Sequence, residues 1–566
     1  MKRSWREHAG TTFDLHKRGA AASRGMVASN HPLASSAGVE MLALGGNAFD
    51  AAVATAFALS VVEPMMVGPF GAGFVNIHHG ATGECTVIDN YSTAPRGATP
   101  GMFEPVSDHW PDYMETVGGK NKIGHLAVGV PGNLKAWCEI SGRYGRLGLG
   151  TLVQPAIRYA RRGFPASRYL VDCIRDSRDD IARFAATAAV FLPAGAPPSP
   201  GGLVVMEELA ASLELIAARG AEALYGGPLG EAAAAEMAAR GGLITQHDLR
   251  EYEIHDRAPV RGTYRGYEIV STPPTSSGGT HIVQMLNLLE GFDIAALGFG
   301  TAAYVHLLSE VLKIAYADRF EFLADPAFVR MPIAGLTAKE YARVRRGEID
   351  RAGPSAHRAG DPAAFGGESG NTTHLTVADD QGNVVAMTQT LNELFGAKVT
   401  VPGTGLLLNN TMALFDPHPG KANSAAPGKR MLSSMSPTVV LKDGKPFMAL
   451  GTPGGMRIFP SVLQAIVNVI DFGMTLQEAV EAPRVWTQGQ ALEVEQGIAE
   501  DTRRQLRGMG HEVEVVSRVA GGMNGVQFED RRGLIHGAAC WRADGTPAGI
   551  SGGPAKFGLV GATYAL

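Results

Sequence analysis

The segment with the clearest potential for chemistry is Asn371-Thr372-Thr373-His374, which stands where a polar stretch meets an apolar strand pattern. A threonine hydroxyl attacks a carbonyl only when a base takes its proton. The residue's own α-amino group can be that base once the chain is cut just before it. Threonine is also common in strands, so a polar entry into a strand is the competing interpretation of these four residues.

Other common catalytic and metal-binding patterns find no support in the sequence. It contains no P-loop, no His-Glu-x-x-His and no EF-hand loop. A Gly-x-Ser-x-Gly pattern occurs at 549–553, but no histidine follows Ser551, and the glycines there favour a turn. Cys85, Cys138, Cys173 and Cys540 form no Cys-x-x-Cys pair and are interpreted as buried or free thiols. We therefore expect no metal and no organic cofactor.

Two periodicities divide the chain near residue 371. Before it, apolar residues recur at spacings of three and four, which predicts a mainly helical segment; after it, alternation predicts two β-hairpins among further helices. Helices are expected at 39–44, 48–62, 133–144, 152–162, 206–219, 280–289, 302–323, 460–472, 475–482 and 502–509, hairpin strands at 374–378 with 384–390 and 438–441 with 447–450, and loops at 192–202 and 351–370. The predicted class is α+β with antiparallel pairing, and Thr372 lies at the start of the first hairpin.

Composition limits the kinds of partner. The chain has 566 residues, 45% hydrophobic and 19% charged, which suits a folded protein of several domains or one large intertwined unit. A formal net charge of −5 without a basic block argues against nucleic acid. The apolar stretch at 51–62 is too short to cross a membrane, and the first twenty residues lack the apolar core of a secretory signal. We therefore expect a cytoplasmic protein without a membrane partner.

Several strings, taken together and in order, resemble the γ-glutamyltranspeptidase family of N-terminal-nucleophile hydrolases. The resemblance covers about residues 25 to 550, and a series of strings is far more specific than one short motif. The strings are GMVAS at 25–29, GGN at 45–47 with DAA at 50–52, PPTSSGGTHIVQ at 273–284, YADR at 316–319, NTTH at 371–374, LLNN at 407–410, KR at 429–430 with LSSMSPT at 432–438, and TPGG at 452–455.

The resemblance implies a precursor that cleaves itself between Asn371 and Thr372. A large chain, 1–371, and a small chain, 372–566, would then stay together as one intertwined unit, an αββα sandwich formed jointly by both processed chains. Thr372 would attack the Asn371 carbonyl during self-cleavage and a small-molecule amide during turnover. The acyl group would pass from Thr372 to water or to an amine.

Further site residues are implied by the same resemblance. Thr390 would hydrogen-bond the nucleophile, and Asn392 would lie in the substrate pocket. Gly454 and Gly455 would form the oxyanion hole with their backbone N–H groups, which the missing Cβ atoms leave accessible. Ser433 and Ser434 match the family's serine pair for the substrate carboxylate, although a polar turn before a proline would also explain two serines.

Two positions depart from the family pattern that holds a glutamyl zwitterion. Tyr91 stands where an arginine is expected, and Leu414 stands where an acidic residue is expected. Tyrosine lacks the bidentate fork that suits a carboxylate, and leucine cannot pair an ammonium. Arg96 is a candidate replacement for the missing arginine. The stretch 415–431 is also short and has no tyrosine for a lid, so we expect an open site that favours hydrolysis.

These departures predict a threonine amidohydrolase with non-glutamyl acyl specificity, in the manner of the cephalosporin-acylase-like and oxamate-amidohydrolase-like branches of the family. Two alternatives stay open. One is a true γ-glutamyltransferase or glutathione hydrolase, and the other is an unprocessed, non-catalytic relative that binds a ligand.

The substitution Thr372→Ala tests self-cleavage directly. At about 105 Da per residue, the processed protein should separate into chains near 39 and 20 kDa on a denaturing gel. The variant should give one band near 60 kDa, because it lacks the attacking hydroxyl. An unbroken wild-type chain in active, purified protein would contradict the prediction.

Overall fold

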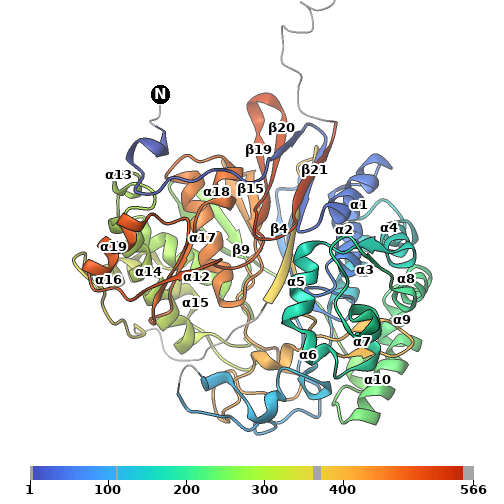
Figure 1. Cartoon of the computed structure of the whole chain (residues 1–566). Coiled ribbons are helices and arrows are strands. Elements are labelled where there is room, and N and C mark those ends of the chain that lie inside the picture. Colours follow the sequence, from blue (N-terminus) through green and yellow to red (C-terminus); the bar gives the residue numbers. More distant parts are fainter. Residues whose placement is uncertain (1–3, 110–111, 361–370, 552–566) are drawn as a thin grey trace, which may run out of the picture.

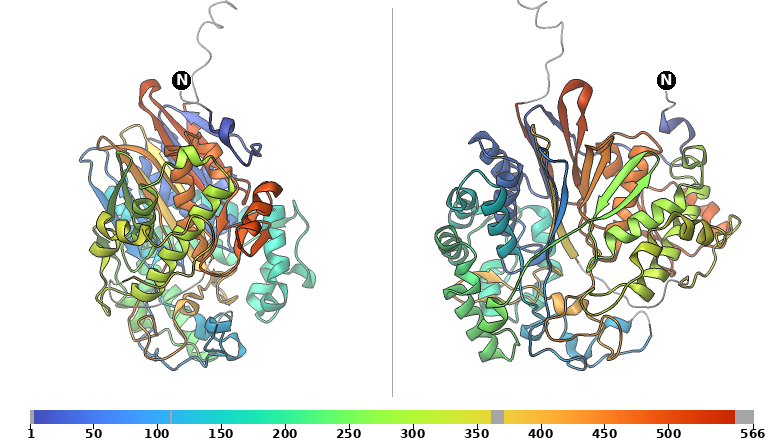
Figure 2. Two further views of the ribbon diagram at one scale, coloured as in Figure 1. Left: turned by 90° about the vertical axis from the view of Figure 1, so that its left-hand side faces the viewer. Right: turned by 180° about the vertical axis from the view of Figure 1, so that it is seen from behind.

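The computed structural model describes residues 4–109, 112–360 and 371–551. Two antiparallel β-sheets of seven strands each are stacked face to face, and a layer of helices covers the outer face of each sheet (Figure 1). Figure 2 shows the same four layers from the side and from behind. The architecture is an αββα sandwich, as the family resemblance implies.

The strands of each sheet come from distant parts of the chain. In spatial order, the first sheet contains β1 (Ala20–Ala22), β20 (Leu534–Ala539), β19 (Asn524–Glu529), β15 (Lys445–Gly451), β14 (Thr438–Lys442), β9 (Tyr267–Ser271) and β8 (Val260–Tyr264). The second contains β21 (Thr546–Ile550), β2 (Gly25–Ser29), β10 (Asn371–Asp379), β11 (Val384–Asn392), β3 (Ala72–His78), β4 (Cys85–Asn90) and β7 (His255–Arg257). Each sheet therefore mixes strands from both sides of the Asn371–Thr372 junction, which is why the two expected chains cannot form separate domains.

Apolar side chains fill the space between the sheets and hold them together. This inner core includes Met26, Ala378 and Ala386 from the second sheet, and Val439, Ala449 and Val526 from the first. Burial of such side chains stabilises a sandwich by about 25 cal/mol for each Å² removed from water. The central strands β10 and β11 are thus packed on both faces.

One helical layer covers the second sheet, and a second helical layer covers the first sheet. The former contains α1 (Pro32–Ala43), α2 (Ala48–Val62), α3 (Asn133–Tyr144), α4 (Leu149–Arg162), α5 (Arg168–Asp176), α6 (Arg178–Ile181), α7 (Ala185–Phe191), α8 (Glu207–Arg219), α9 (Glu222–Tyr225), α10 (Pro228–Arg240) and α11 (Gln246–Arg250). The latter contains α12 (Gly278–Leu289), α13 (Ile294–Leu297), α14 (Ala302–Phe322), α15 (Ile333–Leu336), α16 (Lys339–Arg346), α17 (Ile458–Ile470), α18 (Leu476–Glu481) and α19 (Glu500–Gly508). Short strands outside the sandwich are β5 (Phe164–Pro165), β6 (Leu203–Val204), β12 (Thr400–Val401), β13 (Leu406–Leu407), β16 (Val485–Trp486), β17 (Leu492–Glu495) and β18 (Val513–Val516).

Helix α2 illustrates how local residues in the sequence predict the start of a helix. Asn47 accepts hydrogen bonds from the N–H groups of Phe49 and Asp50, and the Asp50 carboxylate accepts one from the Asn47 N–H. This capping box satisfies donors at the helix start, and every residue of the helix is buried. The helix spans the residues predicted from the sequence, 48–62.

The expectation of a mainly helical segment before residue 371 misses its strands. Six of the strands in the two large sheets, β2, β3, β4, β7, β8 and β9, lie between residues 25 and 271. All seven residues of β3 are buried, because helices cover one face of its sheet and the other sheet covers the opposite face. A strand buried on both faces shows no alternation of polar and apolar residues, so its periodicity cannot be read from the sequence.

The structure also bears on the predicted hairpins and loops. Both predicted hairpins are confirmed as β10 with β11 and β14 with β15. The predicted loop at 192–202 contains one 3-10 turn, Pro193–Gly195, whereas part of the loop at 351–370 lies outside the described residues. Within the described part of the chain, none of the helices has both the length and the apolar character that a bilayer crossing requires.

Candidate active site

Thr372 lies at a β-bulge near the start of β10, at the centre of the second sheet. Asn371 pairs with Asn392, but Thr373 pairs with Gln389, so β11 has one more residue than β10 between these two pairs. Two residues of β11, Thr390 and Leu391, therefore stand opposite the single residue Thr372, and such bulges are common next to active sites. Thr372 is only 3% exposed. Its neighbours must therefore determine how its hydroxyl is presented.

Thr390 and Asn392 lie at the end of the adjacent strand β11, beside Thr372. The Thr390 hydroxyl accepts a hydrogen bond from the Asn392 N–H at 2.6 Å. Asn392 has a φ of +84°, and its side-chain N–H groups donate to the Asn410 carbonyl and Oδ1 at 3.1 and 3.2 Å. The left-handed backbone and these bonds turn the chain sharply after Thr390. The predicted neighbours of the nucleophile are thus brought next to it.

Gly454 and Gly455 lie where the chain leaves β15 and enters the short 3-10 helix Gly455–Arg457, which α17 continues. Backbone N–H groups at the start of such a helical segment point outward and favour negative charge. Gly454 has a φ of +137°, and a Cβ there would lie 2.6 Å from the Cα of Ala520. Only glycine fits this position, and Gly455 borders the same cavity as Thr372.

Ser433 and Ser434 are placed by the string of small residues at 273–279. Ser277 donates hydrogen bonds to the Ser433 carbonyl from its N–H at 2.8 Å and from its hydroxyl at 2.9 Å. The Ser433 N–H donates in return to the Thr275 carbonyl at 3.1 Å. The two strings lie far apart in the sequence, and their pairing holds both serines at the cavity.

Both serine hydroxyls accept a hydrogen bond from the protein. The Met435 N–H donates to Ser433 Oγ at 3.2 Å, and Arg319 Nη2 donates to Ser434 Oγ at 3.0 Å. A hydroxyl that already accepts has its own proton available for donation elsewhere. Ser434 Oγ also donates to Met456 Sδ at 3.8 Å, a weak acceptor that a carboxylate oxygen would displace, so both serines can donate to a carboxylate.

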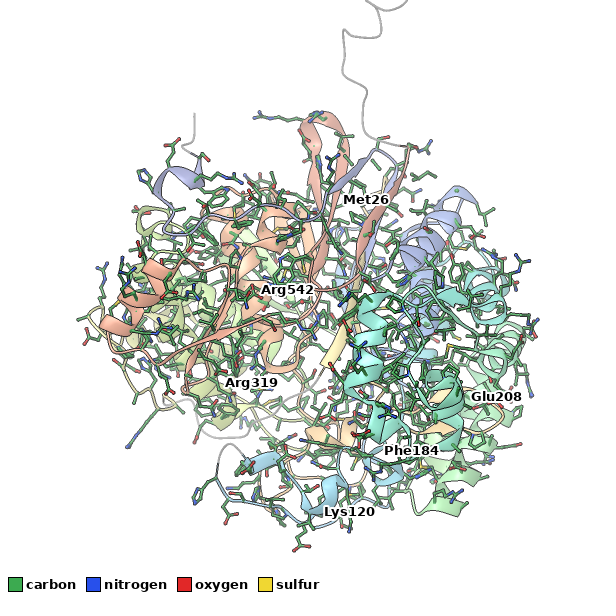
Figure 3. The ribbon with its side chains drawn as sticks, in the orientation of Figure 1. Met26, Lys120, Phe184, Glu208, Arg319 and Arg542 are labelled. Atoms are coloured by element: carbon green, nitrogen blue, oxygen red, sulfur yellow. The ribbon has the colours of Figure 1, made fainter. Side chains whose placement is uncertain are left out.

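Arg319 is a site residue to which the sequence assigns no role. It lies on α14 and is fully buried, and Figure 3 labels its position. Its Nε also donates to Ser277 Oγ at 2.8 Å, so one guanidinium joins the two strings that form the serine site. The string YADR, which contains Arg319, was the available sequence signal. The direction of the Arg319 side chain, however, depends on the packing of α14.

The residues around Thr372 enclose a narrow cavity of about 20 Å³. It brings together seven of the predicted site residues: Tyr91, Thr372, Asn392, Leu414, Ser433, Ser434 and Gly455. Leu432, Met435 and Ile458 complete the lining. Among the described residues that line the cavity, none carries a formal charge.

Tyr91 and Leu414, the two positions that depart from the family pattern, both lie in this lining. Tyr91 is 2% exposed and its ring stacks on Phe74 with centroids 5.2 Å apart. Its carbonyl accepts a hydrogen bond from the Tyr252 hydroxyl at 2.9 Å. Because Tyr91 is fixed from both sides, the position contributes an aromatic wall to the cavity.

The stretch 415–431, which the sequence predicts to leave the site open, is compact in the structure. The stretch 415–431 folds back on itself: Asn423 donates to the Leu414 carbonyl at 2.8 Å, and the Leu432 N–H donates to Asn423 Oδ1 at 3.1 Å. Ser434 is 8% exposed and Leu414 is 4% exposed. None of the residues 415–431 lines the cavity beside Thr372, so the expectation of an open site stays a prediction.

Arg96 does not replace the missing arginine in this structure. It borders a different pocket of about 370 Å³, together with Asp248, Glu251, Glu253 and Arg430. Its N–H donates to Asp248 Oδ1 at 2.8 Å, which holds the backbone there. The expectation for Arg96 relied on the mobility of arginines in loops, whereas the chain from Thr93 to Arg96 lies along the other pocket.

His374, the histidine of the predicted nucleophile string, is a structural residue. Its ring lies between the hydroxyls of Thr388 and Thr376, at 2.8 and 2.9 Å, and packs against Gly451. Complete burial lowers its pKa to about 3, so the ring is neutral at ordinary pH. In the described residues, no group of three or more His, Cys, Asp or Glu side chains is placed to hold a metal ion.

Glu63 is a second residue that the sequence analysis does not identify. Its carboxylate accepts a hydrogen bond at 2.5 Å from the hydroxyl of Thr373, the residue after Thr372. Burial raises the pKa of this carboxyl to about 8. A perturbed carboxyl beside a nucleophile is a feature of functional sites, although structural networks also produce it.

Comparisons with known proteins agree with this geometry. The sequence profile of the family described as Gamma-glutamyltranspeptidase matches residues 34–550. The chain is 55% identical over 546 residues to an acylase ACY 1 proenzyme from Pseudomonas sp. (strain SE83), covering 96% of this chain and 97% of the relative. It is 38% identical over 557 residues to a glutathione hydrolase proenzyme from Bacillus subtilis (strain 168), covering 95% and 94%.

A solved structure extends the similarity to the whole fold. The crystal structure of cephalosporin acylase from Bacillus halodurans superposes with a TM-score of 0.86 and 30% identity. The match covers 96% of this chain and 98% of that one.

The substitution Gly454→Ala should lower kcat for amide hydrolysis by about 10²-fold with little change in KM. The added Cβ collides with Ala520 and displaces the N–H groups expected to stabilise the transition state. Gly101→Ala, where a Cβ meets nothing within 4 Å, is the matched control and should leave the rates unchanged. A fully active Gly454→Ala enzyme would argue against an oxyanion hole at this turn.

Proposed function

Because the chain belongs to the γ-glutamyltranspeptidase family, we propose that this amide hydrolase uses Thr372 to remove an acyl group that lacks the glutamyl amino group. The family and the proenzyme relatives support an N-terminal-nucleophile mechanism. The single observation that carries the acyl specificity is the uncharged lining of the cavity beside Thr372.

Self-cleavage prepares the nucleophile. The Thr372 hydroxyl attacks the carbonyl carbon of Asn371, the peptide C–N bond breaks, and the acyl group passes to the threonine oxygen as an ester. Water then hydrolyses this ester, which leaves a carboxylate on Asn371 and a free α-amino group on Thr372. The chain now consists of residues 1–371 and 372–566.

Turnover repeats the same chemistry on a substrate. The α-amino group takes the hydroxyl proton while Thr372 Oγ attacks the substrate amide, and the N–H groups of Gly454 and Gly455 stabilise the oxyanion. The proton passes to the departing amine, and an acyl ester remains on Thr372. Water, or an amine acceptor, then attacks the ester and restores the hydroxyl.

The lining explains which acyl groups are disfavoured. A glutamyl group would bring an ammonium into the cavity, where Leu414 occupies the position of the family's acidic residue. A charge buried without a partner typically costs several kcal/mol. The amino group of a glutamyl substrate is therefore penalised, and an acyl chain without it is not.

The serine pair favours an acyl group that ends in a carboxylate. Ser433 and Ser434 can both donate, and Arg319 brings a positive charge to within 3.0 Å of Ser434 Oγ. Charge-assisted hydrogen bonds of this kind are stronger than neutral ones. The proposed substrates are therefore monoamides of dicarboxylic acids, and the similarity to a cephalosporin acylase supports a bulky amine on the leaving side.

A glutathione hydrolase or γ-glutamyltransferase is the second candidate. The 38% identity to the Bacillus subtilis glutathione hydrolase proenzyme over nearly the whole chain favours it. The replaced positions Tyr91 and Leu414 argue against it. A cytoplasmic location stays a prediction from the sequence alone.

Two chromogenic substrates that differ only in the α-amino group separate the candidates. We expect glutaryl-p-nitroanilide to be hydrolysed with a kcat/KM at least about 10-fold above that of γ-glutamyl-p-nitroanilide, since only the latter buries an ammonium. Leu414→Asp should reduce this ratio by giving the ammonium a partner, whereas Leu414→Asn, of similar shape but uncharged, should not. A wild-type preference for the glutamyl compound would favour the second candidate.

Arg319→Lys tests how the carboxylate is recognised. Lysine keeps the charge but cannot hydrogen-bond Ser277 and Ser434 with a fixed fork. We expect KM for glutaryl-p-nitroanilide to rise about 10-fold, while kcat/KM for uncharged butyryl-p-nitroanilide stays within about 2-fold. Arg343→Lys, on the exposed face of α16, is the control. An equal loss on both substrates would show a purely structural role.

A further inference from the structure

Glu63 is a buried carboxyl that reaches the strand of the nucleophile from another layer of the fold. It caps the C-terminal end of α2 and is 2% exposed. Its Oε2 accepts the hydrogen bond from Thr373 Oγ1, although the two residues are 310 positions apart in the sequence. The contact therefore ties the helical layer to the residue that follows Thr372.

The proton of the Thr373 hydroxyl has a defined direction. Asn30 Nδ2 donates to Thr373 Oγ1 at 3.2 Å, so the hydroxyl accepts from Asn30 and donates to Glu63. Asn524 Nδ2 lies 3.2 Å from Asn30 Oδ1 and donates to the His374 carbonyl at 2.6 Å. The chain of donors from Asn524 through Asn30 and Thr373 ends at the Glu63 carboxyl.

Strand β10 is irregular where Thr372 lies, so an anchor close to this residue is important. Pairing of β10 with β11 becomes regular only at Thr373, and pairing with β2 begins only at Leu375. Once the chain is cut before Thr372, the start of the strand is a free end, and strand ends fray unless they are tied down. Thr373 carries the first side-chain anchor after the nucleophile.

The segment that begins at Glu63 also holds β11, the strand next to β10 in the same sheet. The Met66 carbonyl accepts a hydrogen bond from the Leu391 N–H at 2.8 Å, and the Met65 carbonyl accepts one from the Phe395 N–H at 2.8 Å. Leu391 lies between Thr390 and Asn392. Residues 63–66 thus fix both strands that form the site. Their backbone carbonyls hold the end of β11, and the Glu63 side chain holds β10 through Thr373.

We propose that Glu63 is a positioning residue for Thr372, which it holds in register through the hydroxyl of Thr373, both for self-cleavage and for turnover. The inference rests on the proposed role of Thr372 as the nucleophile. Geometric misplacement of a reacting group by about 1 Å can cost about 10²-fold in rate, so an anchor one residue away has a measurable effect.

The charge state of Glu63 determines which substitution is conservative. Desolvation raises its pKa to about 8, the hydrogen bond from Thr373 lowers it, and the negative charge of Asp544 raises it. Burial raises the pKa values of Tyr169 and Cys173 on α5, the charge of Glu63 adds to this rise, and Arg518 opposes it. Burial lowers the pKa of His31 to about 4, so its ring is neutral.

With a pKa of about 8, the Glu63 carboxyl is mainly protonated at pH 7. Glutamine is therefore its closest uncharged match.

The experiment compares Glu63→Gln with Glu63→Leu at pH 7 in the full-length protein. Glutamine keeps an oxygen that accepts from Thr373, and leucine fills similar space without an acceptor. Thr373→Val removes the same hydrogen bond from the other side. Glu84→Leu, at an exposed glutamate, is the surface control. The rate of self-cleavage is followed on gels, kcat and KM are measured on fully cleaved protein, and the melting temperature is recorded for every variant.

We expect Glu63→Leu and Thr373→Val to slow self-cleavage and to lower kcat by about 10- to 10²-fold, with KM within about 2-fold. Glu63→Gln should restore most of both rates. The double variant Glu63→Leu/Thr373→Val should be no slower than either single variant, because both remove one interaction.

Wild-type rates in Glu63→Leu, additive losses in the double variant, or failure of Glu63→Gln to restore activity would each overturn the proposal. The Thr372→Ala variant separates this outcome from failure of the proposed function. If that variant still cleaves itself and hydrolyses amides, the role of Thr372 is wrong. If it is inactive while Glu63→Leu is normal, only the role of Glu63 is wrong.

Discussion

The bulge near the start of β10 is the constraint on which the site depends. Thr372 lies there between one pairing register and the next, so its own ladder cannot hold it. Its position is therefore determined by neighbours: Thr390 and Asn392 on β11, Thr373 through Glu63, and the buried inner faces of two sheets. The layers of the sandwich act as a rigid frame for one irregular residue.

A small number of side chains is enough to change the electrostatics of a site within a shared fold. The turn at Gly454 and Gly455, proposed as the oxyanion hole, and the serine pair lie where the family resemblance predicts them, beside Thr372. Tyr91 and Leu414 instead make an apolar wall where paired charges are expected. Desolvation makes a buried charge costly, so two uncharged side chains are enough to alter which acyl group is accepted. Arg319 acts from behind the serines and adds positive charge without entering the lining.

Sequence and structure agree best where the signal is local. The capping box of α2 and the two hairpins follow from residues a few positions apart, and their boundaries are close to those predicted. Strands β2 and β3 were missed because a strand that is buried on both faces has no alternating pattern. The expectation for Arg96 was wrong for a related reason. It depended on how a loop turns, and that turning is determined by hydrogen bonds such as the one from the Arg96 N–H to Asp248 Oδ1.

The sequence by itself determined the class of fold, the family resemblance and the candidate nucleophile, because short strings carry each of these and need no knowledge of distant contacts. Only the tertiary structure decided that the serines can donate into the cavity, that the cavity lining is uncharged, and that Glu63 reaches Thr373. These properties arise from burial and from contacts between residues hundreds of positions apart. Burial and long-range contact depend on how whole layers pack, which no local pattern encodes.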